Sequence, residues 1–286
     1  MSASSHIFGS PDADMIIRAP LRPDDPESTE FRDFHTHKAI LSSASTVFHD
    51  MFSVPQPPQP ADGDTNLPIV QVTESAEVFE TFLQFIYPIE PPTINSPQNV
   101  YNLLQLASKY LTSGIHARLR QALVSPSFLR SDPVWVYAIA CHMDLGEETK
   151  LAITHTYQID LVQDVSHSLL QSMTTEMYNR LLRSHATRRQ QLITALNQTK
   201  SPPSVAGKCS CGPRLYAVLY RGIRLLIWEK PVLDRRRLDS CLDHIKAMPK
   251  SECRLGTSCR VSPQAISAFL ARVLDKIEEL DQTSNH

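Results

Sequence analysis

The chain has 286 residues, of which 42% are hydrophobic and 20% charged, and this composition excludes intrinsic disorder as the state of the whole chain. Its net charge of -2 gives no strong field toward nucleic acid or anionic membranes. With only 8 glycines and no glycine-rich phosphate motif, nucleotide-driven enzymes are disfavoured as well.

The N-terminal region predicts a β-hairpin. Residues 14–19 form a short apolar run that is typical of a buried strand, and the acidic, proline-bearing residues 20–30 predict a surface loop. Residues 31–37 alternate in character and predict the second strand. The first twenty residues lack the features of a secretory signal, so we expect reduced thiols and a cytoplasmic or nuclear location.

From Lys38 the apolar residues recur at helical spacing, which predicts one helix that runs to Phe52. Prolines end this helix, and the tract 55–66 has almost nothing to bury, so we expect it to be mobile or extended. Residues 67–72 predict a further strand. Ser75 then predicts the N-cap of a helix that ends at the prolines after Ile86.

The rest of the chain predicts helices. Ser96-Pro97 and Asp132-Pro133 are typical helix starts, and Gly146 is expected at the far end of the second of these helices. The longest pattern covers residues 178–196, and no apolar stretch approaches the roughly 20 residues of a membrane span. Strands followed by many helices predict an α+β fold with a small sheet and a helical cluster.

Three segments carry a resemblance to a known family. Residues 34–41, FHTHKAIL, with Ser45 and Phe48 after them, are similar to the Phe-x-x-His-[Lys/Arg]-x-x-Leu signature of the BTB/POZ domain. The segments VFETFLQFIYP at 78–88 and NVYNLLQLASKYL at 99–111 resemble the helices that follow in this family. The three matches occur in the family's order and span about residues 12–125.

The resemblance extends beyond the domain to BTB proteins of fungi whose function is otherwise unassigned. Residues 123–152 and 173–189 resemble the helical region that follows the domain in this group. The resemblance implies a BTB/POZ fold, which is a small mixed sheet with a helical cluster, followed by an all-α C-terminal extension. The predicted parts are an N-terminal tail at 1–11, a BTB/POZ domain at 12–125, a helical extension at 126–198, a linker at 199–208 and a cysteine-containing helical region at 209–286.

By this resemblance the chain is a non-enzymatic scaffold or adaptor that binds proteins through homo- or hetero-oligomerisation, without cofactor or small-molecule substrate. A homodimer is one such assembly, although only about a dozen residues precede Met15, where homodimeric members commonly carry a longer exchanged segment. A substrate adaptor of a cullin-type ubiquitin ligase is an alternative function. Such adaptors commonly have a hydrophobic-x-Glu motif after the helix that ends here at Phe52, whereas this chain has Ser53, Val54 and prolines.

Two groups of residues carry metal-ligand chemistry. His35 and His37 share one face of a strand, but no third ligand is near in sequence, and the resemblance makes His37 a structural residue of the strand-to-helix corner. The C-terminal region supplies four thiols that predict a structural zinc site, because Zn²⁺ prefers four such ligands in a tetrahedron. These thiols are Cys209, Cys211, Cys253 and Cys259. Cysteines that simply fill a core are the alternative.

The segment from Arg183 to Arg237 is strongly basic, with twelve Lys or Arg residues against Glu229 and Asp234. A transcription- or chromatin-associated regulator that contacts nucleic acid through this segment is therefore an alternative function. However, Leu215, Val218, Leu219 and Leu226 fall at helical spacing. A core helix with a solvated basic face, or one that docks on the acidic N-terminal part, is favoured over nucleic-acid binding.

Overall fold

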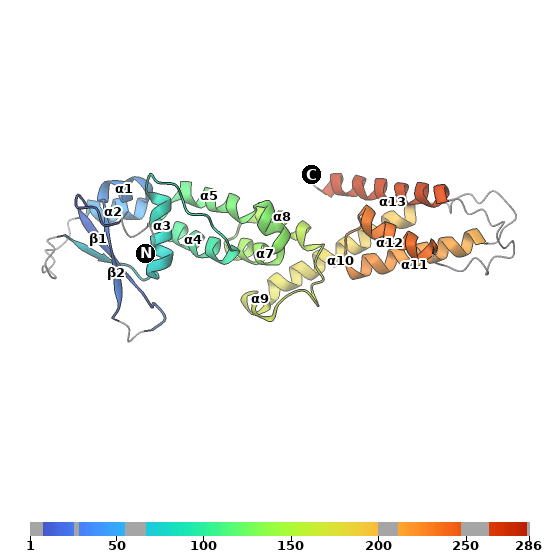
Figure 1. The fold of residues 1–286 in the computed structure, drawn as a ribbon, viewed down its shortest axis with the longest axis horizontal. Helices are drawn as coiled ribbons and strands as arrows, with labels where there is room; N and C mark the ends of the chain where they lie inside the picture. Colours follow the sequence, from blue (N-terminus) through green and yellow to red (C-terminus); the bar gives the residue numbers. More distant parts are fainter. Residues whose placement is uncertain (1–7, 26–28, 55–66, 200–210, 247–262, 285–286) are drawn as a thin grey trace. The chain divides into compact units, whose positions relative to one another are not determined.

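The computed structural model describes residues 8–25, 29–54, 67–199, 211–246 and 263–284. The chain divides into two compact units, which we call unit 1 (Met1–Ala152) and unit 2 (Ile153–His286). Unit 1 contains the sheet and the first helices, and the described part of unit 2 is helical throughout (Figure 1). The predicted fold class, a small mixed sheet with many helices, is confirmed.

Unit 1 begins with a three-stranded sheet in the order β2-β1-β3. β1 (Met15–Pro20) pairs antiparallel with β2 (Phe31–Thr36), with Met15 opposite Thr36, and parallel with β3 (Ile69–Gln71). The predicted hairpin is therefore confirmed, while the third strand is shorter than its apolar run. β1 lies between two partners, and its side chains are buried except those of Arg18 and Pro20, which are half-buried.

The prediction of one helix from Lys38 to Phe52 is wrong, because two helices meet at Ser45. α1 (Lys38–Ala44) ends there, and α2 (Thr46–Ser53) begins. Ser45 has extended backbone angles, its hydroxyl oxygen accepts the backbone N–H of Phe48 at 3.1 Å, and its hydroxyl donates to the carbonyl of Tyr110 at 2.6 Å. The hydrogen bonds of this buried N-cap offset the loss of a continuous helix.

Three helices complete the core of unit 1. They are α3 (Ala76–Ile86), α4 (Pro97–Lys109) and α5 (Ser113–Leu123). The predicted N-caps Ser75 and Ser96 are confirmed, since each side chain accepts a backbone N–H three residues later. The largest side chains with almost no exposed surface in this unit are Met15, Ile16, Ile17, Leu41, Phe48, Phe79, Phe82, Leu83, Leu103, Leu104 and Tyr137.

Unit 1 continues with α6 (Pro126–Ser131) and α7 (Pro133–His142), and α8 (Gly146–Thr156) crosses its boundary with unit 2. Gly146 was expected to end the helix that starts at Pro133, but it is the first residue of α8. The left-handed residue between the two helices is Asp144, with φ of 52°. Aspartate tolerates this conformation better than most residues, which is why a glycine was not needed there.

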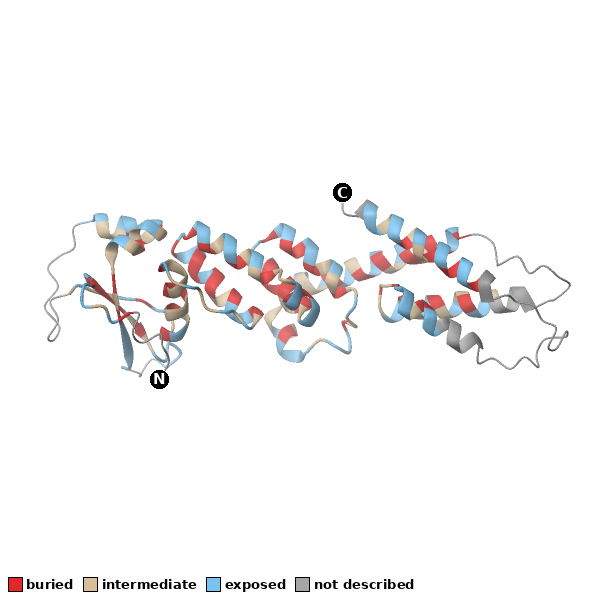
Figure 2. Ribbon diagram, turned by 45° about the horizontal axis from the view of Figure 1, so that its top comes forward, coloured by how far each residue is buried: buried red, intermediate tan, exposed pale blue. Residues whose placement is uncertain are grey.

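Unit 2 is built on a helical core. Its helices after α8 are α9 (His167–Ser172), α10 (Thr175–Gln198), α11 (Cys211–Glu229), α12 (Arg235–Lys246) and α13 (Pro263–Ser284). Buried and exposed residues alternate at helical spacing along α10 and α13, as in amphipathic helices (Figure 2). The core consists of Leu192, Leu196, Leu219, Ile223, Ile227, Leu233, Leu238, Ile266, Phe269, Leu270, Val273 and Ile277. Among the described residues, no helix is both long and apolar enough to cross a bilayer.

The predicted boundaries within the chain stay predictions. The division between the two units at Ala152 falls inside the predicted helical extension 126–198. Phe8 belongs to the predicted N-terminal tail, but it is 5% exposed and contacts the rings of Phe34 and Tyr87. The predicted linker 199–208 lies outside the described residues except for its first residue, which caps α10.

Candidate protein-interaction surface

A polar corner fixes the sheet to the helices of unit 1. The hydroxyl of Tyr87, at the end of α3, accepts the backbone N–H of His37 at 2.9 Å and lies 3.1 Å from the Nδ1 of the same histidine. Burial raises the pKa of Tyr87. On the other side of the ring, Nε2 of His37 lies 3.5 Å from Asp12. His37 is therefore a structural residue, and no group of three metal ligands occurs among the described residues.

Aromatic rings connect α2 to the end of α4. The ring of Phe48 stacks on Tyr110 with centroids 4.8 Å apart and on Phe52 at 5.9 Å. Phe79 and Phe82 from α3 contact the same tyrosine. Since Ser45 also bonds the carbonyl of Tyr110, the N-terminal end of α2 is held beside the end of α4, and the ring of Phe48 continues this contact along the helix.

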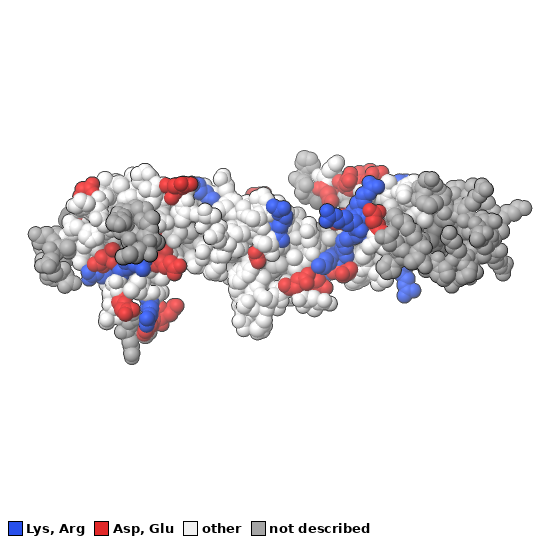
Figure 3. Space-filling view, viewed as in Figure 1, with Lys and Arg blue, Asp and Glu red and all other residues white. Residues whose placement is uncertain are grey.

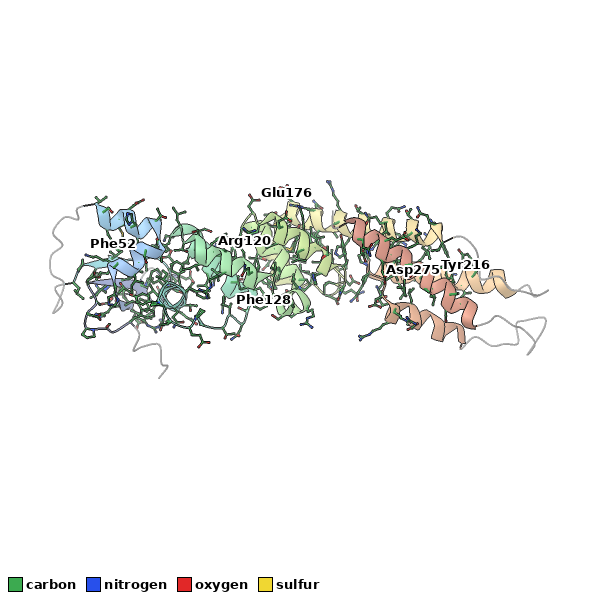
Figure 4. All side chains as sticks on the ribbon, turned by 90° about the horizontal axis from the view of Figure 1, so that it is seen from above. Phe52, Arg120, Phe128, Glu176, Tyr216 and Asp275 are labelled. Atoms are coloured by element: carbon green, nitrogen blue, oxygen red, sulfur yellow. The ribbon has the colours of Figure 1, made fainter. Side chains whose placement is uncertain are left out.

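Apolar side chains are exposed at the C-terminal end of α2 and just after α4. Phe52 is half-buried, Val54 is 60% exposed and Leu111 is 59% exposed, and we call these three residues the α2–α4 patch. Figure 4 shows Phe52 on α2, far along unit 1 from Arg120 and Phe128. The ring of Phe48 links the two parts of the patch, since it contacts both Phe52 and Tyr110, the residue before Leu111.

The backbone of Leu111 adds a second observation. Its φ is 50°, a left-handed conformation that costs a leucine about 1 kcal/mol or more and that glycine or asparagine adopts at lower cost. Burial does not offset this cost, because the side chain is exposed. The conformation ends α4, because it lets the backbone N–H of Thr112 donate to the carbonyl of Ala107 at 2.9 Å.

Charges near the patch are paired within unit 1. Glu74 accepts the ammonium of Lys109 at 2.5 Å and the hydroxyl of Tyr110 at 3.1 Å. Burial, followed by the charge of Glu74, raises the pKa of Tyr110, so this hydroxyl stays protonated. On the hairpin, Arg18 holds Asp33 in a bidentate pair at 2.8 and 2.9 Å. The ammonium of Lys109 and the hydroxyl of Tyr110, which adjoin Leu111 in sequence, are therefore satisfied within unit 1.

An ion pair ties α5 to α8. Arg120 donates to both carboxylate oxygens of Glu148 at 2.7 and 3.0 Å, and the side chain of Glu148 is 10% exposed. These bonds lower the pKa of Glu148, while burial lowers the pKa of His116 beside it. The pair fixes the N-terminal part of α8 to α5 within unit 1.

We expect Glu148→Ala to destabilise unit 1 by about 1–3 kcal/mol, because it leaves the Arg120 guanidinium without its partner. Since the folded-state pKa of Glu148 is lowered from 4.5, its contribution is present above that pH and is lost as the pH falls below it. Glu147→Ala is the matched control, because Glu147 pairs with Lys150 on the surface and should change stability by less than about 0.5 kcal/mol. Urea unfolding at pH 7 measures the stability of both variants. Equal destabilisation by Glu148→Ala and Glu147→Ala would contradict a structural role for the Arg120–Glu148 pair.

The predicted zinc ligands cannot be placed together. Cys209, Cys253 and Cys259 lie outside the described residues, and Cys211 is the first residue of α11, with its side chain not described. The zinc site therefore stays a prediction. Cys141 is the cysteine whose side chain is described, and it is a free thiol, half-buried on α7.

If the four thiols bind zinc, protein prepared without chelator should contain close to one zinc per chain by metal analysis. Replacing Cys209 and Cys253 by serine should remove the metal, because two ligands are too few for a structural site. Cys141→Ser is the control and should leave the zinc content unchanged. A zinc content near zero in the unaltered chain would rule the site out.

The basic segment folds largely into unit 2. Arg188 pairs with Asp281 of α13, and Lys230 pairs with Asp164 at 3.1 Å. Arg237 donates to three backbone carbonyls at the end of α11, those of Leu226, Lys230 and Val232. On the face drawn in Figure 3, basic and acidic side chains of this unit lie beside one another. Charge pairing of this kind leaves fewer cations for phosphates.

The predicted core helix in this segment is confirmed as α11, but its inward face is displaced from the expected one. Leu219 is buried as expected, together with Ile223 and Ile227, whereas Val218 is 38% exposed. Leu225 and Trp228 are also exposed. The signal for this second apolar face was present in the spacing, because residues 218 and 225 are seven apart.

Comparison with known proteins bears on unit 1. A family profile described as "BTB/POZ domain" matches residues 28–127. The comparison with curated proteins gave no match. The matched range contains the His37 corner, the aromatic rings around Tyr110 and the α2–α4 patch.

Proposed function

We propose that this chain, whose residues 28–127 form a BTB/POZ domain, is a scaffold or adaptor that assembles proteins through homo- or hetero-oligomerisation. The domain is a non-enzymatic protein-interaction module. We propose that the rest of the chain is non-enzymatic too, because the sequence contains no GxSxG, HExxH or phosphate-loop motif. The free thiol of Cys141 supports a reducing location, which we propose is the cytoplasm or nucleus.

The observation that carries the proposal is the α2–α4 patch. Val54 and Leu111 expose most of their apolar surface. Their burial against another protein would gain roughly 25 cal/mol per Å² of apolar surface covered. Lys109, which precedes Leu111 by two residues, already pairs with Glu74 within the domain, so this ammonium does not oppose docking.

Sedimentation velocity of the full chain over a range of concentrations tests the proposal for a homodimer. We expect Val54→Glu and Leu111→Glu to shift association toward monomer without changing Tm, because a carboxylate in an apolar contact is costly and both side chains are exposed. Leu21→Glu is the control, since Leu21 is 42% exposed on the hairpin, outside the patch. The proposal is overturned if the unaltered chain is monomeric and both patch variants still bind every cellular partner of the unaltered chain.

An adaptor for a cullin-type ubiquitin ligase is a more specific form of the same proposal. The exposure of Val54 at the end of α2 supports it, whereas the prolines that follow stand where such adaptors commonly have their motif. Co-purification of a cullin that depends on Val54 distinguishes this role from a scaffold without ligase.

A nucleic-acid-associated regulator is the alternative from another class. Arg221, Arg235 and Arg236 are exposed and support it, while the ion pairs of Arg188 and Lys230 do not. Binding to duplex DNA or RNA that falls steeply with salt would favour this role. Absence of binding at low salt would exclude it.

A further inference from the structure

Helix α11 has two apolar faces. Its inner face carries Ile223 and Ile227 into the core of unit 2, and both are almost fully buried. On the other side, Val218, Leu225 and Trp228 are 38%, 62% and 60% exposed. A helix that packs on one side needs apolar residues on that side alone, so the exposed set requires a separate explanation.

The three exposed residues form one stripe. At about 100° per residue, Val218, Leu225 and Trp228 fall within roughly 80° of one another, and the middle of this arc is about 180° from Ile223. The stripe extends about 15 Å along the helix at roughly 1.5 Å per residue. Arg221 lies within the same arc, and we call these four residues the outer stripe of α11.

The outer stripe is positively charged. Within the described part of the chain, Arg221 and Arg224 form no ion pair, and the guanidinium of Arg224 lies 5.8 Å from the ring centre of Tyr220. The acidic residue at the end of the helix, Glu229, is already bound by Arg237 at 3.1 Å. An occupant of the stripe therefore meets apolar side chains together with Arg221, which has no ion pair within the described residues, and with Arg224 at the border, which contacts the ring of Tyr220 rather than a carboxylate of the described residues.

We propose that the outer stripe of α11 docks an amphipathic helix of another protein, with branched apolar residues on the docking face and carboxylates along its flanks. Two helices pack by fitting side-chain ridges into grooves, and a row such as Val218 and Leu225 supplies one ridge. Carboxylates on the flanks would pair with Arg221 and Arg224. This surface lies in unit 2, so the proposal is independent of the BTB/POZ domain.

Charge argues against a second copy of α11 and against the undescribed segments on either side of α11 and α12 as occupants. A symmetric pair of α11 stripes would place Arg221 and Arg224 against their own copies, which is repulsive. The undescribed residues 247–262 and 200–210 carry a net positive charge, since the first holds Lys250, Arg254 and Arg260 against Glu252.

Nucleic acid fits the stripe less well than a protein helix does. Phosphates would pair with the arginines but leave Leu225 and Trp228 in water, because the duplex backbone offers no apolar cover. An acidic amphipathic helix both pairs with the arginines and covers the apolar side chains of the stripe.

Two synthetic 21-residue helical peptides with the same leucine face test the proposal, one with glutamates and the other with lysines on its flanks. With a fluorescent label on the peptide, anisotropy measures binding to the full chain. We expect the acidic peptide to bind at least about tenfold more tightly than the basic one, and more weakly as salt rises. Equal affinities for the two peptides, or no binding, would overturn the proposal.

Variants separate the stripe from other surfaces. Leu225→Ser and Trp228→Ser should each weaken the acidic peptide about tenfold with Tm unchanged, because both side chains are exposed. The pair Arg221→Glu and Arg224→Glu should reverse the preference between the two peptides. Val162→Ser, at an 84% exposed valine of the same unit, is the control. If the stripe variants instead abolish self-association of the chain or its binding to duplex nucleic acid, the stripe binds a different occupant and the proposal is rejected.

Discussion

Replacing Phe48 by alanine should destabilise unit 1 by about 3–5 kcal/mol, which would lower its Tm by roughly 10 °C for a unit of this size. Phe48 is 1% exposed, and its ring lies 4.8 Å from Tyr110 and 5.9 Å from Phe52. Alanine would leave a cavity beneath the α2–α4 patch that the surrounding rings cannot fill without moving. Thermal unfolding and urea titration, both followed by circular dichroism, measure the loss.

Phe52→Ala is the matched control for this prediction. Phe52 lies one turn further along α2 but is half-buried, so its loss should cost only about 1 kcal/mol. The two variants also separate structure from binding, because Phe48→Ala should reduce partner binding through instability and Val54→Glu without it. Equal destabilisation by the two phenylalanine variants would mean that the stack on Tyr110 does not hold the end of α2.

Local signals predicted much of unit 1. Alternation predicted the hairpin because β2 has one buried and one exposed side near its end, and Ser75 and Ser96-Pro97 predicted helix starts because capping involves residues three positions apart. The BTB/POZ resemblance depended on three segments, at 34–48, 78–88 and 99–111, each of which is continuous in sequence. Patterns within one helix or hairpin are therefore readable from the chain alone.

Features that depend on distant residues were missed. The break between α1 and α2 at Ser45 involves a hydrogen bond to the carbonyl of Tyr110, which lies 65 positions away. No sequence pattern near Ser45 predicts that partner. The exposure of Leu111 depends on a left-handed backbone that leucine rarely adopts. In α11 both faces are apolar, so spacing alone could not tell that Ile223, and not Val218, faces the core.

Unit 2 contains a buried histidine whose surroundings define its protonation state. His185 on α10 is fully buried, and its Nε2 lies 3.0 Å from Oγ1 of Thr156. The threonine hydroxyl donates its only proton to the carbonyl of Ile153 at 2.6 Å, so Nε2 of the histidine must be the donor. Nδ1 then carries the lone pair, and no described group bonds to it.

A second proton on His185 is disfavoured for two reasons. Burial removes the charged ring from water, and the nearby charge of Arg189 repels it, which together lower its pKa from 6.5 to about 4 in spite of Asp160. The unfolded chain therefore binds a proton between these two pH values that the folded chain does not. Stability from the neutral histidine is complete above pH 6.5 and falls as the pH drops toward 4.

We therefore expect unit 2 to lose up to about 3 kcal/mol of stability between pH 7 and pH 4, from a shift of about 2.5 pKa units. His185→Gln, which retains a donor toward Thr156 but cannot titrate, should flatten this dependence, while His167→Gln, at an exposed position of the same unit, should not. Urea unfolding at pH 7, 6, 5 and 4.5 measures the slopes. This range lies above the pH at which the carboxylates Glu148 and Asp164, whose pKa values are lowered, lose their contributions. If His185→Gln follows the slope of the unaltered chain, a different group controls the acid sensitivity of unit 2.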